Sequence, residues 1–144
     1  MRTKQNYSKI LVFTALLFGF LANAGTTNPK LPEPALDFLK MHFTGYSISQ
    51  VETGAISDNL FRVTLSEGIS ILFDKRGNWK GINGNYRALP KTILPKGINK
   101  HINENFKSQV VVTADKKSWG YKVRLMDGKT VEYNNSGKFL RIDK

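Results

Sequence analysis

The chain reads FRVTLSEGISILFDKRGNW at residues 61–79 and, sixty positions later, YKVRLMDGKTVEYNNSGKF at residues 121–139. The two stretches align without a gap, and aromatic residues, aliphatic residues and glycines occupy corresponding places, as Gly68 and Gly128 do. Self-similarity at a fixed spacing is typical of a duplicated supersecondary unit. The sequence therefore predicts that the same unit occurs twice.

Each copy has the pattern of a β-hairpin. Apolar and polar side chains alternate on both sides of Glu67-Gly68, which is the period of a half-buried strand. A three-residue loop at 66–68 places Val63 opposite Ile71 and keeps the apolar side chains on one face, whereas a two-residue loop would divide them between faces. Such a loop needs a left-handed residue at its third position, where glycine has no Cβ to clash. We therefore predict positive φ angles at Gly68 and Gly128.

A helix and a strand are expected before each hairpin. Leu31-Pro32 and Leu94-Pro95 precede segments whose apolar residues recur at helical spacing, and proline is tolerated in the first turn of a helix. Strands are expected at 47–53 and 109–114, with a loop at 115–120. The predicted fold is α+β, in which two tandem αββββ repeats form an antiparallel sheet with helices packed on one face.

The first 24 residues have the features of a secretory signal peptide. A positive segment with Arg2, Lys4 and Lys9 precedes a twelve-residue apolar run, Ile10–Leu21, and an Ala-Asn-Ala cleavage signal ends at Ala24. The apolar run is short for a bilayer span, which disfavours the alternative of an uncleaved anchor. The predicted division is therefore a signal peptide at 1–24 and one domain at 25–144, built of repeats 31–83 and 89–144.

Composition excludes several kinds of site. The chain has no cysteine, so it forms no disulfide, carries no lipid-modified cysteine and has no cysteine-ligated metal. Removal of the signal peptide takes three basic and no acidic residues, which lowers the formal net charge from +11 to about +8. We expect a basic protein located in the periplasm or secreted, which meets the membrane only transiently during export.

The repeated motifs resemble those of a known family. The Leu-Pro pairs at 31–32 and 94–95 and the aromatic-Asp/Asn-x-x-Gly-x-aromatic turns at 73–79 and 133–139 are similar to those of PepSY-like periplasmic proteins of the Bacteroidetes. Those proteins resemble β-lactamase-inhibitor protein in fold. The resemblance covers residues 31–144 and implies protein binding or inhibition through the open face of the sheet.

Candidate catalytic residues are sparse. His42 and His101 fall on separate helices at positions that do not correspond in the two repeats, and no carboxylate or hydroxyl stands at a recognisable triad spacing. Asp74 and Asp127 are explained as turn residues, and a cation would need more oxygen ligands nearby. We therefore expect no enzyme activity, no cofactor and no metal site.

Candidate binding residues lie on the strand faces that point away from the helices. Alternation places Arg62 and Leu72 on this face in the first repeat, and Lys122 and Arg124 in the second. Trp119, which lies in a loop beside lysines, is an exposed anchor or folds back onto the sheet. An ordinary solvated face is the alternative, because antiparallel sheets commonly leave one side exposed to water.

The sequence thus favours an exported binding module whose partner is a protein or peptide of the cell envelope. The alternative is a polyanion-binding protein that recognises an envelope polysaccharide or a lipid headgroup through its positive charge. Nucleic acid is not an expected partner, because the chain is exported and its aromatic residues lie mainly on the predicted core face.

Overall fold

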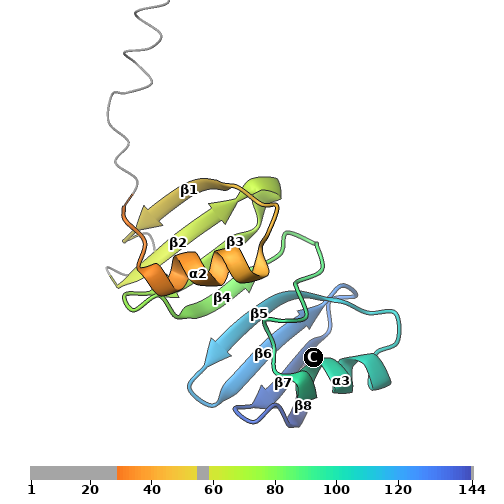
Figure 1. Ribbon diagram of the computed structural model, residues 1–144. Helices are drawn as coiled ribbons and strands as arrows, with labels where there is room; N and C mark the ends of the chain where they lie inside the picture. Colours follow the sequence, from red (N-terminus) through yellow and green to blue (C-terminus); the bar gives the residue numbers. More distant parts are fainter. Residues whose placement is uncertain (1–28, 55–58, 144) are drawn as a thin grey trace, which may run out of the picture.

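The computed structural model describes residues 29–54 and 59–143. The predicted signal peptide, residues 1–24, lies outside these residues. Figure 1 shows a helix followed by four strands, twice in succession. The elements of the first unit are α2 (Glu33–His42), β1 (Ile48–Thr53), β2 (Leu60–Leu65), β3 (Ser70–Asp74) and β4 (Trp79–Asn83), and those of the second are α3 (Lys96–Asn105), β5 (Val111–Lys117), β6 (Gly120–Leu125), β7 (Thr130–Asn134) and β8 (Phe139–Asp143).

All eight strands belong to one open antiparallel sheet. Their order in space is their order in the chain, β1 to β8, so β1 and β8 form the two edges. The two units are joined by the pairing of β4 with β5, in which Gly81 lies opposite Asp115 and Ile82 opposite Ala114. In the described residues the fold is therefore α+β, with two helices and an eight-stranded sheet.

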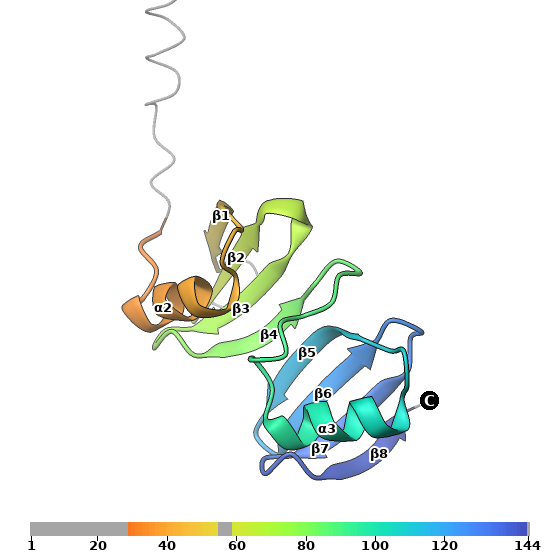
Figure 2. The same ribbon diagram turned by 45° about the vertical axis from the view of Figure 1, so that its right-hand side comes forward.

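Both helices cover the same face of the sheet (Figures 1 and 2). Phe38 of α2 makes an edge contact with Phe73 of β3, with ring centroids 5.6 Å apart. His101 of α3 makes the corresponding contact with Tyr133 of β7 at 5.5 Å. A continuous row of opposed residues links the two contacts across the sheet: Ile71, Ile82, Ala114, Val123 and Val131. The opposite face, which we call the open face, has no helix against it among the described residues.

The core combines the apolar side chains that strand alternation places on the helical face with buried side chains of the two helices and the segments next to them. Val63, Ile71, Phe73, Val123 and Tyr133 are fully buried. Burial of a large apolar side chain contributes about 1.5–3 kcal/mol, so these residues dominate the stability of the sheet. Phe61 and Tyr121, which share the face, are only partly buried and pack against the edge of this cluster.

The hairpin prediction is confirmed. Val63 lies opposite Ile71, and Val123 lies opposite Val131. Gly68 has a φ of +77° and Gly128 a φ of +91°. Glu67 also adopts a left-handed conformation with a φ of 64°, which the three-residue loop did not require.

The loop predicted at 115–120 is wrong. β5 continues to Lys117, which lies opposite Gly120, so the connection to β6 is the two-residue turn Ser118-Trp119. The apolar alternation ends at Ala114, but the backbone of Asp115 to Lys117 stays extended because it remains paired with β6. Exposed lysines thus occupy the end of a strand where the sequence indicated a loop.

Candidate functional site

Two parallel rows of side chains cross the open face, one residue from each strand. The charged row runs from β1 to β8 through Glu52, Arg62, Leu72, Gly81, Asp115, Lys122, Glu132 and Arg141. The polar row runs beside it through Gln50, Thr64, Ser70, Asn83, Thr113, Arg124, Thr130 and Asp143. These two rows of the open face are therefore largely polar, with alternating charges and one large apolar side chain, Leu72.

Four of the five predicted binding residues lie in these rows. Arg62 and Leu72 are directly opposed on β2 and β3, and Lys122 belongs to the same row four strands from Arg62. With strands about 4.8 Å apart, that separation is roughly 19 Å. Arg124 lies two residues from Lys122, in the polar row. The fifth residue, Trp119, lies in the β5–β6 turn at one end of the sheet and is 42% exposed.

Lys122 takes part in a network of ion pairs on β6, β7 and β8. Its Nζ lies 2.8 Å from Oδ2 of Asp143 and 3.7 Å from Oε1 of Glu132. Arg141 covers the same glutamate, because its Nε donates to Oε2 of Glu132 at 2.7 Å. Glu132 is thereby only 5% exposed although it lies on the open face. Lys122 is thus already paired within the protein.

This network of ion pairs was not predicted from the sequence. The pairing depends on the register of β7 and β8, in which Glu132 lies opposite Arg141. An uninterrupted register from Tyr133 opposite Phe139 would place Leu140 opposite Glu132. The register shift between Glu132 and Tyr133 brings Arg141 there instead, so strand alternation alone does not predict the pair.

The ion pairs predict an acid-sensitive fold. The hydrogen bond from Arg141 holds the pKa of Glu132 below its ordinary value, and the hydrogen bond from Lys122 does the same for the pKa of Asp143. A lowered folded-state pKa stabilises the protein above the unfolded-state value of about 4, and that stabilisation is lost as the pH falls through the folded-state value.

We therefore expect the free energy of unfolding to fall below about pH 4, and to fall less steeply in Glu132→Gln, which keeps the side-chain shape but cannot ionise. Urea denaturation across this pH range measures both slopes. Parallel curves for the two proteins would contradict the role given to Glu132.

A shallow hollow of about 300 Å³ lies on the open face over β5, β6 and β7. Its polar lining is formed by Thr113, Asp115, Lys122, Arg124 and Thr130. Within residues 29–54 and 59–143, neither Arg124 nor Arg62 forms an ion pair. Arg124 is exposed, so its guanidinium is available to a carboxylate of a partner. The hollow can hold a polar side chain, with hydroxyl groups beside the cation.

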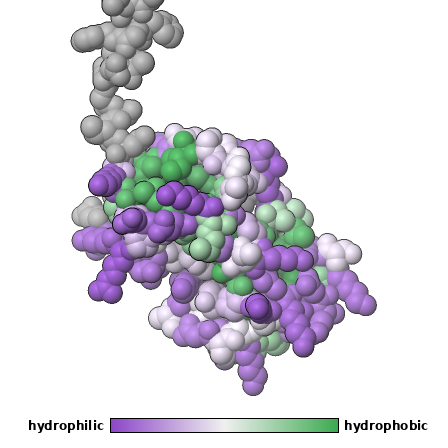
Figure 3. Space-filling view, viewed as in Figure 1, coloured by the Kyte–Doolittle hydropathy of each residue, from purple (hydrophilic) through white to green (hydrophobic). Residues whose placement is uncertain are grey.

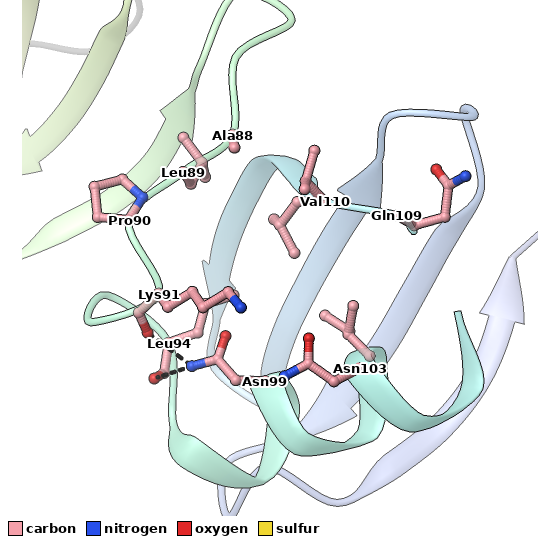
Figure 4. Close-up of a pocket in the computed structure, with 11 residues that line it drawn as sticks. Ala88, Leu89, Pro90, Lys91, Leu94, Asn99, Asn103, Gln109 and Val110 are labelled. Atoms are coloured by element: carbon pink, nitrogen blue, oxygen red, sulfur yellow. Dashed lines mark hydrogen bonds between the residues drawn. The ribbon is translucent and has the colours of Figure 1, made fainter. Parts of the chain in front are cut away.

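Hollows also lie on the helical side, two of them between a helix and a neighbouring segment. One is a pocket of about 80 Å³ between α3 and the connector 88–94, shown in Figure 4. Asn99 projects toward the connector there and donates from Nδ2 to the carbonyl oxygen of Lys91 at 2.7 Å. Ligand pockets usually measure about 300–1,000 Å³, so this space is a packing gap rather than a ligand site.

The other is an apolar groove of about 370 Å³ in the first unit. It lies between α2 and the start of β1, in the region where apolar side chains gather in Figure 3. Leu36, Leu39, Phe43 and Ile48 line it. The corresponding place in the second unit is covered by the connector, whose Leu89 and Ile93 are buried.

The histidines have structural contacts. Nδ1 of His42 lies 2.7 Å from Oγ1 of Thr92, which ties α2 to the connector, and partial burial lowers the pKa of this histidine. His101 stacks on Phe139 and lies 2.9 Å from the Tyr133 hydroxyl. Burial raises the pKa of that tyrosine to about 12, so it stays neutral at physiological pH.

Oxygen ligands for a cation are also scarce in the described part of the chain. It contains no cluster of three or more His, Asp or Glu side chains that could hold a metal ion. Asp74 uses one carboxylate oxygen to accept the backbone N–H groups of Arg76 and Asn78, each at 2.9 Å. The pKa of Asp74 lies below its ordinary value, an effect of these hydrogen bonds that outweighs desolvation. Asp74 thus stabilises its own turn.

Comparison with known proteins gives one family and several similar folds. The family model described as "Putative beta-lactamase-inhibitor-like, PepSY-like" matches residues 59–141. No curated protein matches the chain.

Three solved structures share the fold. A protein from Bacteroides vulgatus, described as a putative periplasmic protein of unknown function, is 24% identical with a TM-score of 0.74, and the match covers 83% of this chain and 97% of that one. A second B. vulgatus protein, described as a putative periplasmic protein of the DUF2874 family, is 26% identical with a TM-score of 0.71, covering 83% and 100%. A protein from Bacteroides thetaiotaomicron, described as putative calcium-regulated and periplasmic, is 23% identical with a TM-score of 0.73, covering 80% and 91%.

Proposed function

Because the chain belongs to the PepSY-like family, we propose that it is an exported, non-enzymatic binding module that holds a protein or peptide partner on its open face. The observation that supports this most strongly is the pair of arginines, Arg62 and Arg124, which form no ion pair within the described residues. Arg62 lies opposite Leu72, the one large apolar side chain of the two rows, and Arg124 lines the polar hollow. Protein interfaces combine an apolar centre with a polar rim and are enriched in arginine.

The charge balance of the open face favours a polypeptide over a polyanion. In the charged row, Arg62, Lys122 and Arg141 are matched by three carboxylates, and in the polar row Arg124 is matched by one. The two rows therefore carry no net charge, although the whole chain is strongly basic. A surface built for a polysaccharide or lipid headgroup would concentrate cations rather than alternate them.

Salt dependence tests this choice. We expect the affinity for the captured partner to fall only modestly between about 50 and 500 mM salt, because screening acts on a few exposed charges while apolar contact is retained. Binding of the partner at each salt concentration, measured by surface plasmon resonance, gives the slope. A steep linear fall in log affinity with log salt would instead support the polyanion alternative.

We also infer that the chain is a duplicated structure resembling β-lactamase-inhibitor protein, with repeats 31–83 and 89–144 in a domain that spans 25–144. Support comes from the constant offsets between the two units. Each element from β2 to β4 starts sixty positions before its counterpart, and α2 and β1 start sixty-three positions before theirs. Three extra residues in the first unit between β1 and β2 account for the difference.

We propose that the protein is periplasmic or secreted after cleavage behind Ala24. The similar Bacteroides proteins are described as putative periplasmic proteins. Among the described residues, no helix has the length and apolar character needed to cross a membrane. Mass spectrometry of the protein purified from its native host should find Gly25 at the N-terminus. An N-terminus at Met1 would contradict export by this route.

A further inference from the structure

The outer edge of the second unit exposes apolar side chains that the first unit buries. Phe139 and Ile142 on β8 are 39% and 46% exposed. The residues at the corresponding positions on β4, Trp79 and Ile82, are 8% and 3% exposed. The difference arises because β5 lies against β4, whereas no strand lies against β8 in the described chain. Exposed apolar residues on an edge strand mark a place where another strand can add.

The junction of β4 with β5 shows what such an addition would look like. There Ile82 lies opposite Ala114, and the ring of Trp79 lies 6.2 Å from that of Tyr121 on β6. In the proposed contact, β8 of one copy takes the place of β4, and β1 of a second copy takes the place of β5. Ile142 corresponds to Ile82 and Val51 to Ala114, so Ile142 lies opposite Val51 of the second copy. This contact also brings Phe139 toward Phe61 of the second copy, because Phe61 corresponds to Tyr121.

The charges at the two edges are complementary in this arrangement. The β4–β5 pair of Gly81 and Asp115 corresponds to Arg141 opposite Glu52. Arg141 ends the charged row at β8, and Glu52 begins it at β1. Addition of a second copy therefore continues the charged row from one molecule into the next, with positive and negative residues still alternating. Arg141 then lies between Glu132 of its own chain and Glu52 of the second copy. Opposite charges directly across neighbouring strands stabilise their pairing.

The irregularities of the two edges are compatible with pairing. β1 has a register shift between Ile48 and Gln50, and β5 has one at the corresponding place, between Val111 and Thr113. The shift between β7 and β8 likewise corresponds to that between β3 and β4. β4 and β5 pair in spite of these shifts, so the shifts do not block β8 from pairing with β1.

We propose that two copies of this chain associate head to tail, with β8 of one copy pairing antiparallel with β1 of the other. A single molecule cannot make this contact, because β1 and β8 lie at opposite ends of its sheet (Figures 1 and 2). The contact is heterologous, so each pair leaves one β1 and one β8 edge free to add further copies. The open face stays uncovered, and this assembly is therefore independent of partner binding there.

Mixing two cysteine variants tests the register directly, because the chain has no cysteine of its own. Glu52→Cys and Arg141→Cys are purified separately, one with an affinity tag, and then mixed and mildly oxidised. Opposed residues in an antiparallel pair have Cα atoms about 4.5–5.5 Å apart, within the range of a disulfide. We expect a disulfide-linked heterodimer in the mixture and little homodimer from either variant alone.

The control mixes Glu52→Cys with Arg124→Cys, an exposed arginine of the same face in the middle of the sheet. A heterodimer yield no higher than in this control would overturn the proposal, and so would a predominance of either homodimer, which indicates symmetric edge pairing. Because Arg141 covers Glu132, circular dichroism first confirms that each variant is folded. Gln50→Cys with Asp143→Cys, the next opposed pair in the same register, is the second test pair.

Sedimentation velocity measures the association of the protein without a cross-link. The wild-type protein should show a mass that rises with concentration, and Ile142→Lys should stay monomeric over the same range. Ile142 is nearly half exposed, so lysine is tolerated there in the single molecule. A wild-type protein that is monomeric at every concentration, or an Ile142→Lys variant that associates equally, would contradict head-to-tail pairing.

Discussion

Gly120→Ala is expected to destabilise the protein by more than about 4 kcal/mol, which is exceptional for a single substitution. Gly120 begins β6 with a φ of +153°, and a Cβ built there would overlap the carbonyl oxygen of Tyr133 on β7. It would also lie 2.7 Å from two backbone atoms of Asn134. Since the obstacle is backbone, the clash is relieved only if β6 and β7 separate. Urea denaturation followed by circular dichroism measures the loss.

Gly128→Ala is the matched control. Gly128 also has a positive φ, +91°, but its Cβ would meet nothing within 4 Å. Its substitution should therefore cost only the strain of placing alanine in the left-handed region, about 1–2 kcal/mol. If Gly120→Ala melts like Gly128→Ala, the close approach of the β5–β6 turn to β7 is wrong.

Arg62→Glu combined with Arg124→Glu is expected to abolish capture of the partner while the protein remains folded. Neither arginine forms an ion pair within the described residues, and neither belongs to the buried core. Substitutions at such positions usually change stability by less than about 0.5 kcal/mol each. Charge reversal places two carboxylates on the open face where the partner is expected to meet cations. Pull-down from envelope extract, with thermal melting of both proteins, measures capture and folding.

The control changes the same total charge on the helical side. Lys40→Glu with Lys96→Glu alters two exposed lysines, one on each helix, and should leave capture intact. Equal loss in both double variants would indicate attraction by net charge and favour a polyanion. If the open-face variant captures the partner as the wild type does, the open face is only solvated. The groove lined by Leu36 and Phe43 then becomes the next surface to test.

The fold was predictable from the sequence wherever the apolar pattern of a segment and the backbone preferences of its residues indicated the same element. The hairpins were predictable because one register alone placed Val63, Ile71 and their neighbours on one face. The helices were predictable because proline and helical spacing coincide after Leu31 and Leu94. The end of β5 was not predictable. Lys116 and Lys117 are extended because their backbone pairs with β6, and backbone pairing produces no apolar pattern in the sequence.

The candidate site was predictable in position but not in its interactions. Alternation placed Arg62, Lys122 and Arg124 on the open face, where they lie. It did not reveal that Lys122 is held by Asp143, since that contact depends on where β8 follows β7. The exposure of Ile142 was not predictable for a similar reason. An apolar residue in a strand pattern is buried or exposed according to whether another strand lies beside it.

Site-specific photo-cross-linking tests the role of the open face most directly. In one variant, a photoreactive residue replaces Leu72 on β3, the strand between β2 and β4. In the other, the same residue replaces the exposed Asp37 of α2. We predict that the captured partner cross-links through position 72 and not through position 37. Cross-linking through position 37 alone, by a protein that still captures the partner, would contradict binding on the open face.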